Sequence, residues 1–221
     1  MRIIAGSAKG RKLKSVKGRG VRPTLGKVRE ALFDILAPRL EGARFLDLFA
    51  GVGAVGLEAA SRGATWVVLV EVAPRHARLI EQNALELGLA ERVRVMRASA
   101  HAAMEALERL GEAFDIIFMD PPYSEARTVA DTLERLASHA GLLREGGVVV
   151  VQHDCRLAPP PRVGDLAQRR SRRFGDNTLT FYERSGDTGG PCSASGTGLL
   201  PQPEPEPRAP RARSEPCLPA P

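Results

Sequence analysis

Four consecutive residues, Asp120-Pro121-Pro122-Tyr123, combine a carboxylate, a rigid turn and an aromatic ring. They follow an apolar run, 114–119, whose β-forming residues predict a buried strand. Since proline fixes φ and restricts the residue before it, the carbonyls of this turn are held in place. The exocyclic amine of a flat base could donate to Asp120 and to the Pro121 carbonyl, with Tyr123 stacked on the ring. A strand-to-helix turn with a capping aspartate is the alternative interpretation of so short a motif.

A glycine-rich segment provides a second group of candidate functional residues. Gly51, Gly53 and Gly56 form a G-x-G-x-x-G that directly follows a predicted strand at 44–49, and Glu71 ends the next predicted strand. Glycines at these positions permit a tight turn and a close approach of the backbone to a ligand, and the carboxylate could accept hydrogen bonds from ribose hydroxyls. This context favours a ligand that contains a nucleoside, and both NAD and S-adenosylmethionine qualify.

One further carboxylate bears on the choice between these two ligands. Asp47 lies four residues before Gly51, where it could face a ligand ammonium but would repel a pyrophosphate. The amine-binding turn at 120–123 has no evident role in hydride transfer. A loop-capping role is the structural alternative for Asp47. Together these features favour the methyl donor S-adenosylmethionine over NAD.

The rest of the sequence predicts the elements that position these residues. Apolar residues at helical spacing predict a helix over 24–37 that ends at Pro38. The alternation of strands and helices predicts a doubly wound, mostly parallel α/β sheet of seven strands with an antiparallel terminal strand, a Rossmann-like fold. The other predicted helices span 55–62, 74–87, 100–110 and 127–140, and the predicted strands span 44–49, 66–71, 93–96, 114–119, 147–152, about 172–174, and 178–182.

Composition limits the class of protein. The chain has 221 residues, of which 43% are hydrophobic, so it can form one globular domain with a sizeable core. Residues 185–221 hold nine of the 17 prolines and are predicted to be disordered. Outside this tail Cys155 is the only cysteine, and no metal-ligand spacing, signal peptide or membrane span is evident. We therefore expect a cytoplasmic protein, a monomer, that needs neither a membrane nor a metal.

Positive charge is concentrated in two segments. The formal net charge is +6, and the first 30 residues contain ten Lys and Arg residues against one acidic residue, Glu30. Clustered cations of this kind are typical of proteins that bind the phosphate backbone of nucleic acids, although a solvated arm is the alternative. A second cluster precedes the last predicted strand and consists of Arg162, Arg169, Arg170, Arg172 and Arg173.

Seven short segments match those of one family in the same order: 1–6, 22–24, 28–33, 47–51, 56–59, 120–123 and 178–182. In this combination the chain resembles the bacterial small-subunit (16S) ribosomal RNA guanine-N2 methyltransferases of the RsmD type. The resemblance covers residues 1–184 and implies a class I methyltransferase domain with a basic N-terminal segment at about 1–22. It implies transfer of a methyl group from S-adenosylmethionine to a guanine N2 amine of ribosomal RNA, free or in a partly assembled small subunit, with S-adenosylhomocysteine as product.

The resemblance also implies roles for individual residues. Donor binding would fall to Thr24, Asp47, Phe49, Ala50, Gly51, Gly53, Glu71 and Ser99. The target base would be held by Asp120, Pro121, Pro122 and Tyr123. From their charge and position, the residues predicted to contact RNA are Lys9, Arg11, Lys12, Lys14 and Arg22.

The chain departs from the family pattern at four positions. Val52 replaces a usual serine, Gly26 and Asp34 replace a usual aspartate and asparagine, and Ser99 replaces a usual aspartate. The last change weakens the expected contact to the adenine amine, because a hydroxyl is a weaker acceptor than a carboxylate.

Other functions remain open at the level of sequence. DNA or RNA adenine-N6 methyltransferases and protein-glutamine methyltransferases use related tetrapeptides, so guanine rests on the family resemblance alone. An NAD-binding oxidoreductase and a non-catalytic RNA-binding module are the alternatives from other classes.

Overall fold

The computed structural model describes residues 1–15, 24–121 and 126–185, with the backbone alone described for residues 24, 25, 126 and 127. These residues lie within one compact unit, Met1–Asp187. The tail that is predicted to be disordered, residues 185–221, lies outside the described residues from 186 onward. Three residues with predicted roles, Arg22, Pro122 and Tyr123, also lie outside it.

Helices and strands alternate along the chain as the sequence predicts. The helices are α1 (Thr24–Leu40), α2 (Ala54–Ser61), α3 (Pro74–Leu87), α4 (Ala100–Arg109) and α5 (Ala126–Ser138), with short 3₁₀ turns at Ala90–Arg92 and Ala140–Leu142. The strands are β1 (Arg44–Asp47), β2 (Trp66–Val70), β3 (Val93–Met96), β4 (Phe114–Met119), β5 (Leu143–Asp154), β6 (Arg162–Val163), β7 (Leu166–Phe174) and β8 (Asn177–Arg184).

All of these strands form one sheet, in the order β3-β2-β1-β4-β5-β8-β7-β6. The first five are parallel to one another, and β8, β7 and β6 are added in antiparallel pairings, which confirms the predicted fold class. The predicted number of seven strands is wrong, because the described residues form eight. The additional strand, β6, has two residues, Arg162 and Val163, which is too short to produce an alternating pattern in the sequence.

The end of α1 also differs from the prediction. The helix continues through Pro38 and ends at Leu40. A proline removes its own N–H donor and disfavours helix before it, but residues after it can still donate to earlier carbonyls. Pro38 therefore lies in the last turn of the helix and does not end it.

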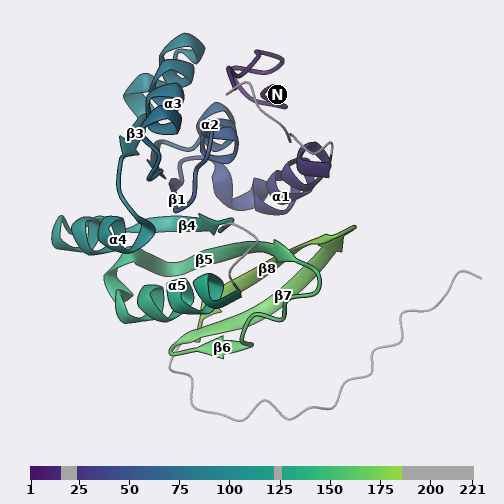
Figure 1. Ribbon diagram of the computed structural model, residues 1–221, viewed down its shortest axis with the longest axis vertical. Coiled ribbons are helices and arrows are strands. Elements are labelled where there is room, and N and C mark those ends of the chain that lie inside the picture. The colour runs from purple at the N-terminus through teal and green to yellow at the C-terminus, as the bar shows by residue number, and fades with distance from the viewer. Residues whose placement is uncertain (16–23, 122–125, 186–221) are drawn as a thin grey trace, which may run out of the picture. The chain divides into compact units, whose positions relative to one another are not determined.

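The two faces of the sheet are covered by different helices (Figure 1). Along β4, Ile116 and Phe118 belong to a core shared with α1, α2 and α3, whereas Ile117 and Met119 belong to a core shared with α4 and α5. This is the alternation of side chains expected for a strand that is buried on both faces. Asp120 follows Phe118 by two positions and is thereby expected on the α1 side.

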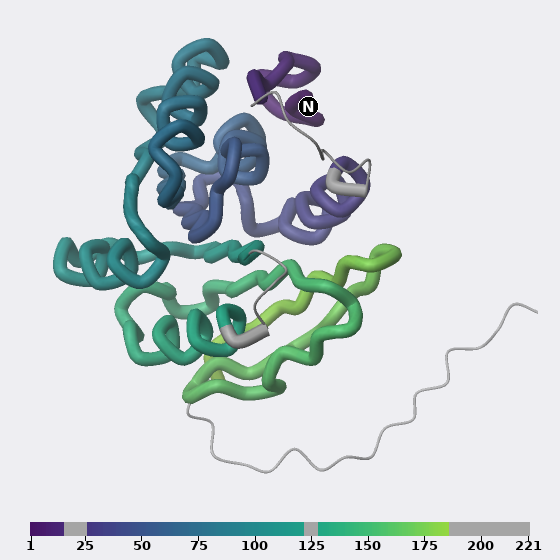
Figure 2. The backbone as a smooth tube through the Cα atoms, viewed as in Figure 1, coloured from purple at the N-terminus to yellow at the C-terminus, as the bar shows by residue number. Residues whose placement is uncertain are grey.

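The N-terminal segment, residues 1–15, passes beside α2 and α3 (Figure 2). The backbone N–H groups of Ile4 and Ala5 donate to Glu58 of α2, at 2.8 and 2.9 Å. Further along, the N–H of Lys14 donates to Asn83 Oδ1 of α3 at 2.9 Å. The described part of the basic segment is therefore folded onto the helical layer.

Candidate active site

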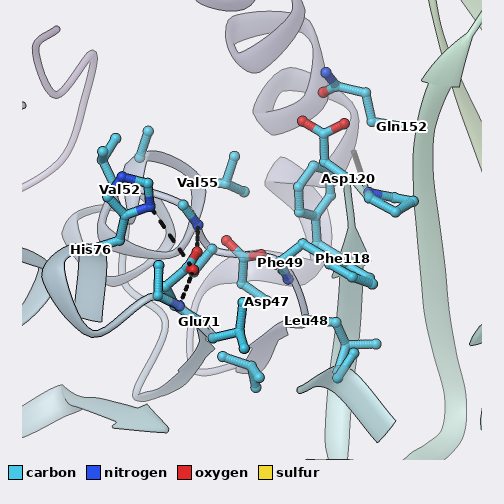
Figure 3. Close-up of a pocket in the computed structure, with 18 of the residues that line it drawn as sticks. Asp47, Leu48, Phe49, Val52, Val55, Glu71, His76, Phe118, Asp120 and Gln152 are labelled. Atoms are coloured by element: carbon cyan, nitrogen blue, oxygen red, sulfur yellow. Dashed lines mark hydrogen bonds and ion pairs between the residues drawn. The ribbon is translucent and has the colours of Figure 1, made fainter. Parts of the chain in front are cut away.

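A cavity of about 620 Å³ opens at the carboxyl ends of β1, β2, β4 and β5 (Figure 3). This is the edge of an open α/β sheet at which ligands bind, and the volume is typical of a small-molecule site. Most of the wall is apolar. Eight of the residues predicted to form the site line this cavity: Asp47, Phe49, Ala50, Gly51, Glu71, Ser99, Asp120 and Pro121. The side chain of Thr24 lies outside the described residues.

The glycine loop has the geometry that its sequence predicts. Gly51 and Gly53 adopt positive φ of 56° and 80°, and Gly53 caps the N-terminus of α2. A Cβ on Gly51 would meet no atom within 4 Å, so this backbone faces open space in the cavity. A Cβ on Gly56 would lie 2.2 Å from Leu69, which shows that the third glycine permits close packing of α2 on β2. Gly53 itself supports the turn and does not line the cavity.

Glu71 connects the glycine loop to the start of α3. Its Oε2 accepts from the Gly51 N–H at 2.8 Å, and its Oε1 accepts from the Ala73 N–H at 2.7 Å. His76 Nδ1 lies 3.9 Å from the same carboxylate. Because a carboxylate oxygen can accept more than one hydrogen bond, Glu71 keeps acceptor capacity toward the cavity.

Two aspartates of the cavity have strongly perturbed acidity. Burial raises the pKa of Asp47 to about 7, and the negative charges of Asp120 and Glu71 add to this against a hydrogen bond from the Phe49 N–H. Burial likewise raises the pKa of Asp120 to about 7. Asp120 Oδ1 is buried and has no hydrogen-bond partner among the described residues. Such groups favour a ligand that brings positive charge or hydrogen-bond donors.

Ser99 lies at the cavity wall but also serves the fold. It is the N-cap of α4, and its hydroxyl accepts from the Ala102 N–H at 3.2 Å. A serine in this position is a favoured helix cap. The hydroxyl hydrogen is still available to a ligand.

The described cations with a predicted RNA role lie on the surface of the N-terminal segment. Lys9, Arg11, Lys12 and Lys14 are all exposed. Arg11 donates to the Glu86 carbonyl and Lys14 pairs with the Glu86 carboxylate, so these two side chains contact α3. Lys9 and Lys12 form no ion pair with any described residue. None of these four cations lines the cavity. One pair, Arg11 and Lys14, contacts α3, and the other pair, Lys9 and Lys12, does not form ion pairs with described residues.

The cavity wall also contains residues that were not predicted to form the site, among them Met1, Arg29, His76 and Gln152. Gln152 had a detectable signal, because it is a polar residue after the buried run Val148–Val151, as Asp120 is after β4. Arg29 had no such signal, since α1 brings it to the site from a distant part of the chain. It is 6% exposed and donates to the Arg2 carbonyl at 2.6 Å.

The cavity can hold a ligand that contains a nucleoside and a cationic group. Beside this ligand it can hold a second molecule that carries polar hydrogens. No cluster of three His, Cys, Asp or Glu side chains that could hold a metal ion occurs among the described residues. Within the same residues, no helix is long and apolar enough to cross a bilayer.

The glycine loop, the acidic end of β2 and the antiparallel strands β7 and β8 define a class I methyltransferase fold. A putative methyltransferase from Escherichia coli, yhhF, has this structure, with a TM-score of 0.72 and 33% identity over 83% of this chain and 97% of that one.

Sequence comparisons identify the family. The model of the family described as conserved hypothetical protein 95 matches residues 1–183. The chain is 38% identical to the putative rRNA methyltransferase YlbH of Bacillus subtilis, over 84% of this chain and 100% of that protein. It is 33% identical to ribosomal RNA small subunit methyltransferase D of Escherichia coli K12, over 83% of this chain and 90% of that protein. The chain belongs to this family of RsmD-type methyltransferases, which confirms the resemblance.

Proposed function

We propose that this protein transfers a methyl group from S-adenosylmethionine to the exocyclic N2 amine of a guanine in small-subunit ribosomal RNA. The observation that carries the proposal is Asp120, whose buried Oδ1 has no partner among the described residues and which shares one cavity with the glycine loop and Glu71. The relatives named as ribosomal RNA methyltransferases support the choice of RNA. We assign the activity to residues 1–184, the part covered by the family. A ribosomal RNA substrate would place the protein in the cytoplasm.

The wall of the cavity fits the methyl donor better than NAD. Glu71, held by the N–H groups of Gly51 and Ala73, would accept hydrogen bonds from ribose hydroxyls. Asp47, buried at the end of β1, would face the cationic part of the donor. Asp47, unlike Glu71, would repel a pyrophosphate and so favours the methyl donor. When bound, S-adenosylmethionine supplies an electrophilic methyl group on a positively charged sulfur.

Residues at the end of β4 would prepare the amine for attack. The lone pair of the guanine amine is delocalised into the ring, so the amine is a poor nucleophile. Hydrogen bonds from the amine to Asp120 and to the Pro121 carbonyl would favour the pyramidal amine, on which positive charge develops. Alignment of the amine with the methyl group supplies the remaining acceleration. Tyr123, outside the described residues, is proposed to stack on the base, which would restore about 1 to 3 kcal/mol of stacking energy after the base leaves its helix.

Ligand-dependent stability separates the donor from NAD. S-adenosylhomocysteine at about 100 times its Kd should stabilise the fold by about 2.7 kcal/mol, because it binds only the native state. NAD at the same concentration should leave the melting temperature unchanged. Stabilisation by NAD and not by S-adenosylhomocysteine would exclude the proposed donor.

A cluster of exposed arginines lies on β7, which is separated from β5 and the cavity wall by one strand, β8. Gln152 of β5 is in register with Leu179 of β8, and Leu179 is in register with Arg172 of β7. One row of residues across three strands therefore connects the cavity wall with the arginine cluster near β7. Within this cluster, Arg169, Arg170, Arg172 and Arg173 are exposed. An RNA whose target base enters the cavity would have its phosphates within reach of such a surface.

RNA binding by the N-terminal cations has a measurable salt signature. Replacing Lys9 and Lys12 by glutamine should reduce the slope of log K against log salt by about 0.7 to 0.9 for each phosphate that the variant no longer neutralises. A matched control replaces Arg109 and Arg135, which are exposed residues of α4 and α5, the helices on the other face of the sheet. An equal change of slope in the control, or none in the Lys9 and Lys12 variant, would assign this segment another role.

The raised pKa values of the aspartates predict a pH dependence. Burial raises the pKa of Asp120 from 3.8 to about 7, so its ionised, hydrogen-accepting form increases as the pH rises through 7. We expect kcat/KM for RNA to increase from about pH 5.5 to about 7 and then to level off. A rate that is constant from pH 5.5 to 7 would argue against an ionised Asp120 in the reaction.

The raised pKa values of Asp120 and Asp47 also affect the stability of the fold. Their contribution to stability is fully present below pH 3.8 and is lost as the pH rises through 7.

A further inference from the structure

A glutamine that the proposed transfer step does not use lies beside Asp120. Gln152 of β5 is 4% exposed, and its Nε2 is buried without a hydrogen-bond partner among the described residues. Figure 3 shows its amide next to the Asp120 carboxylate at one end of the cavity. Two buried polar groups that lack partners are costly to the fold. This end of the cavity is therefore complementary to a ligand that supplies polar atoms to both.

The position of this pair is set by the sheet. Met119 of β4 is in register with Val151 of β5, so the next residues along the two parallel strands, Asp120 and Gln152, are neighbours. Val150 and Phe118, two positions earlier, both belong to the core under α1, which places Asp120 and Gln152 on that same side. A side chain held on a strand is positioned more rigidly than one on a loop.

The hydrogen-bonding groups of an amide match one particular edge of guanine. Next to the N2 amine, the Watson–Crick edge of guanine presents the N1–H donor and then the O6 acceptor. An amide presents one acceptor and one donor side by side, and rotation about its last torsion angle decides which faces which. Resting on the proposed function, we infer that Gln152 reads the N1–H and O6 of the guanine whose N2 amine is held by Asp120. Enzymes that extrude a base commonly read it through this edge.

This arrangement distinguishes guanine from other bases that carry an amine. Adenine has an acceptor at N1 beside its amine and only a C–H group beyond it, so the amide could form one hydrogen bond and would leave its other group buried and unpaired. The base 2-aminopurine keeps the 2-amine of guanine but lacks both N1–H and O6. Sites built to hydrogen-bond a substrate group reject analogues that lack it. Gln152 is thus assigned as a specificity-determining residue.

The test compares two RNAs that differ only at the position that the wild-type enzyme methylates, one with guanine and one with 2-aminopurine. For the Gln152→Met variant, which retains side-chain size but not the amide, the preference for guanine in kcat/KM should fall about 10- to 100-fold below that of the wild-type enzyme. The intrinsic reactivities of the two amines cancel in this comparison. Gln82→Met, at an exposed position of α3, makes the same chemical change and should leave the preference unaltered.

Three further measurements keep the outcome interpretable. Melting temperature and S-adenosylhomocysteine affinity establish that the Gln152→Met protein is folded and binds the donor product. The wild-type protein, without any substitution, should bind the guanine RNA at least about tenfold more tightly than the 2-aminopurine RNA. An unchanged preference in a folded Gln152→Met protein, or equal binding of the two RNAs by the wild type, would overturn the assignment. Absence of methyl transfer to any guanine amine by the wild type would instead overturn the proposed function.

Discussion

Replacing Asp120 by alanine should lower the rate of methyl transfer to ribosomal RNA by about 10²- to 10³-fold, the range typical for removal of one preorganised electrostatic interaction. The carboxylate is the only ionisable group at the described end of β4, and its buried Oδ1 is available to accept from the amine. The affinity for S-adenosylhomocysteine should change little, because Glu71 and the glycine loop hold that part of the ligand. Single-turnover rates and donor-product affinity, measured on the same protein, separate the two effects.

Asp131 provides the matched control for this substitution. It is an exposed residue of α5, on the other face of the sheet, and Asp131→Ala removes the same chemical group. The control should retain the wild-type rate. Near-normal turnover of the Asp120→Ala protein would show that the amine does not depend on this carboxylate.

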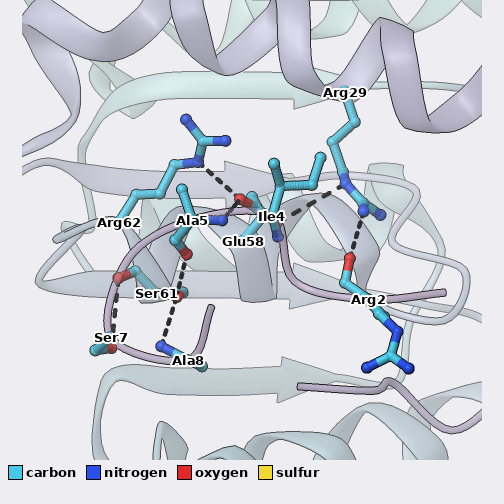
Figure 4. A network of polar contacts seen from close by, with 9 residues as sticks. All are labelled: Arg2, Ile4, Ala5, Ser7, Ala8, Arg29, Glu58, Ser61 and Arg62. Atoms are coloured by element: carbon cyan, nitrogen blue, oxygen red, sulfur yellow. Dashed lines mark hydrogen bonds and ion pairs between the residues drawn. The ribbon is translucent and has the colours of Figure 1, made fainter. Parts of the chain in front are cut away.

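Replacing Glu58 by glutamine should have the largest effect on stability. The Glu58 side chain is fully buried in α2 and accepts from the Ile4 N–H, the Ala5 N–H and Arg62 Nε, the last at 2.7 Å (Figure 4). Arg29 Nε lies 3.9 Å away and is only 6% exposed. Removal of the carboxylate charge leaves a buried guanidinium without its counter-charge, which typically costs about 3 to 5 kcal/mol. Urea unfolding should reveal a loss of this size, with a decrease in melting temperature of roughly 10 °C.

The effect of Glu58 should extend to the N-terminal segment. Gly6 lies beside this network with φ +82°, and a Cβ there would be 1.8 Å from the Ser61 carbonyl oxygen, so the segment fits closely against α2. Hydrogen exchange of the Ile4 and Ala5 amides should therefore accelerate in the variant. Glu86→Gln, at an exposed ion pair with Lys14, is the control and should change stability by less than about 1 kcal/mol. Equal losses for both variants would mean that Glu58 does not anchor the segment.

Local patterns predict most of the fold. The bounds of α3, β3 and β4 agree with those expected from the spacing of apolar residues, because each of these elements has a clear period and a clear end. Strand β6 escapes such a prediction because two residues carry no period. The predicted end of α1 is wrong because a proline usually stops a helix, whereas Pro38 is tolerated in a final turn whose following residues keep their own hydrogen bonds.

The site is predictable where chemistry follows directly from a motif. Asp47, Gly51, Glu71 and Asp120 each end a strand or begin a loop at the carboxyl edge of the sheet, so their convergence follows from the topology. The buried contacts of Arg29 with Arg2 and Glu58 could not be predicted, since they join parts of the chain through packing and not through spacing. The hydrogen bond by which Ser99 caps α4 could likewise not be predicted from the sequence.

Methyl transfer to ribosomal RNA, followed by nucleoside analysis, tests the central claim most directly. Small-subunit RNA from cells that lack this activity, free or in partly assembled particles, is incubated with the protein and S-adenosylmethionine labelled in its methyl group. We predict that the label appears in N2-methylguanosine. Label in N6-methyladenosine, or no labelled nucleoside with either form of the substrate, would contradict the account.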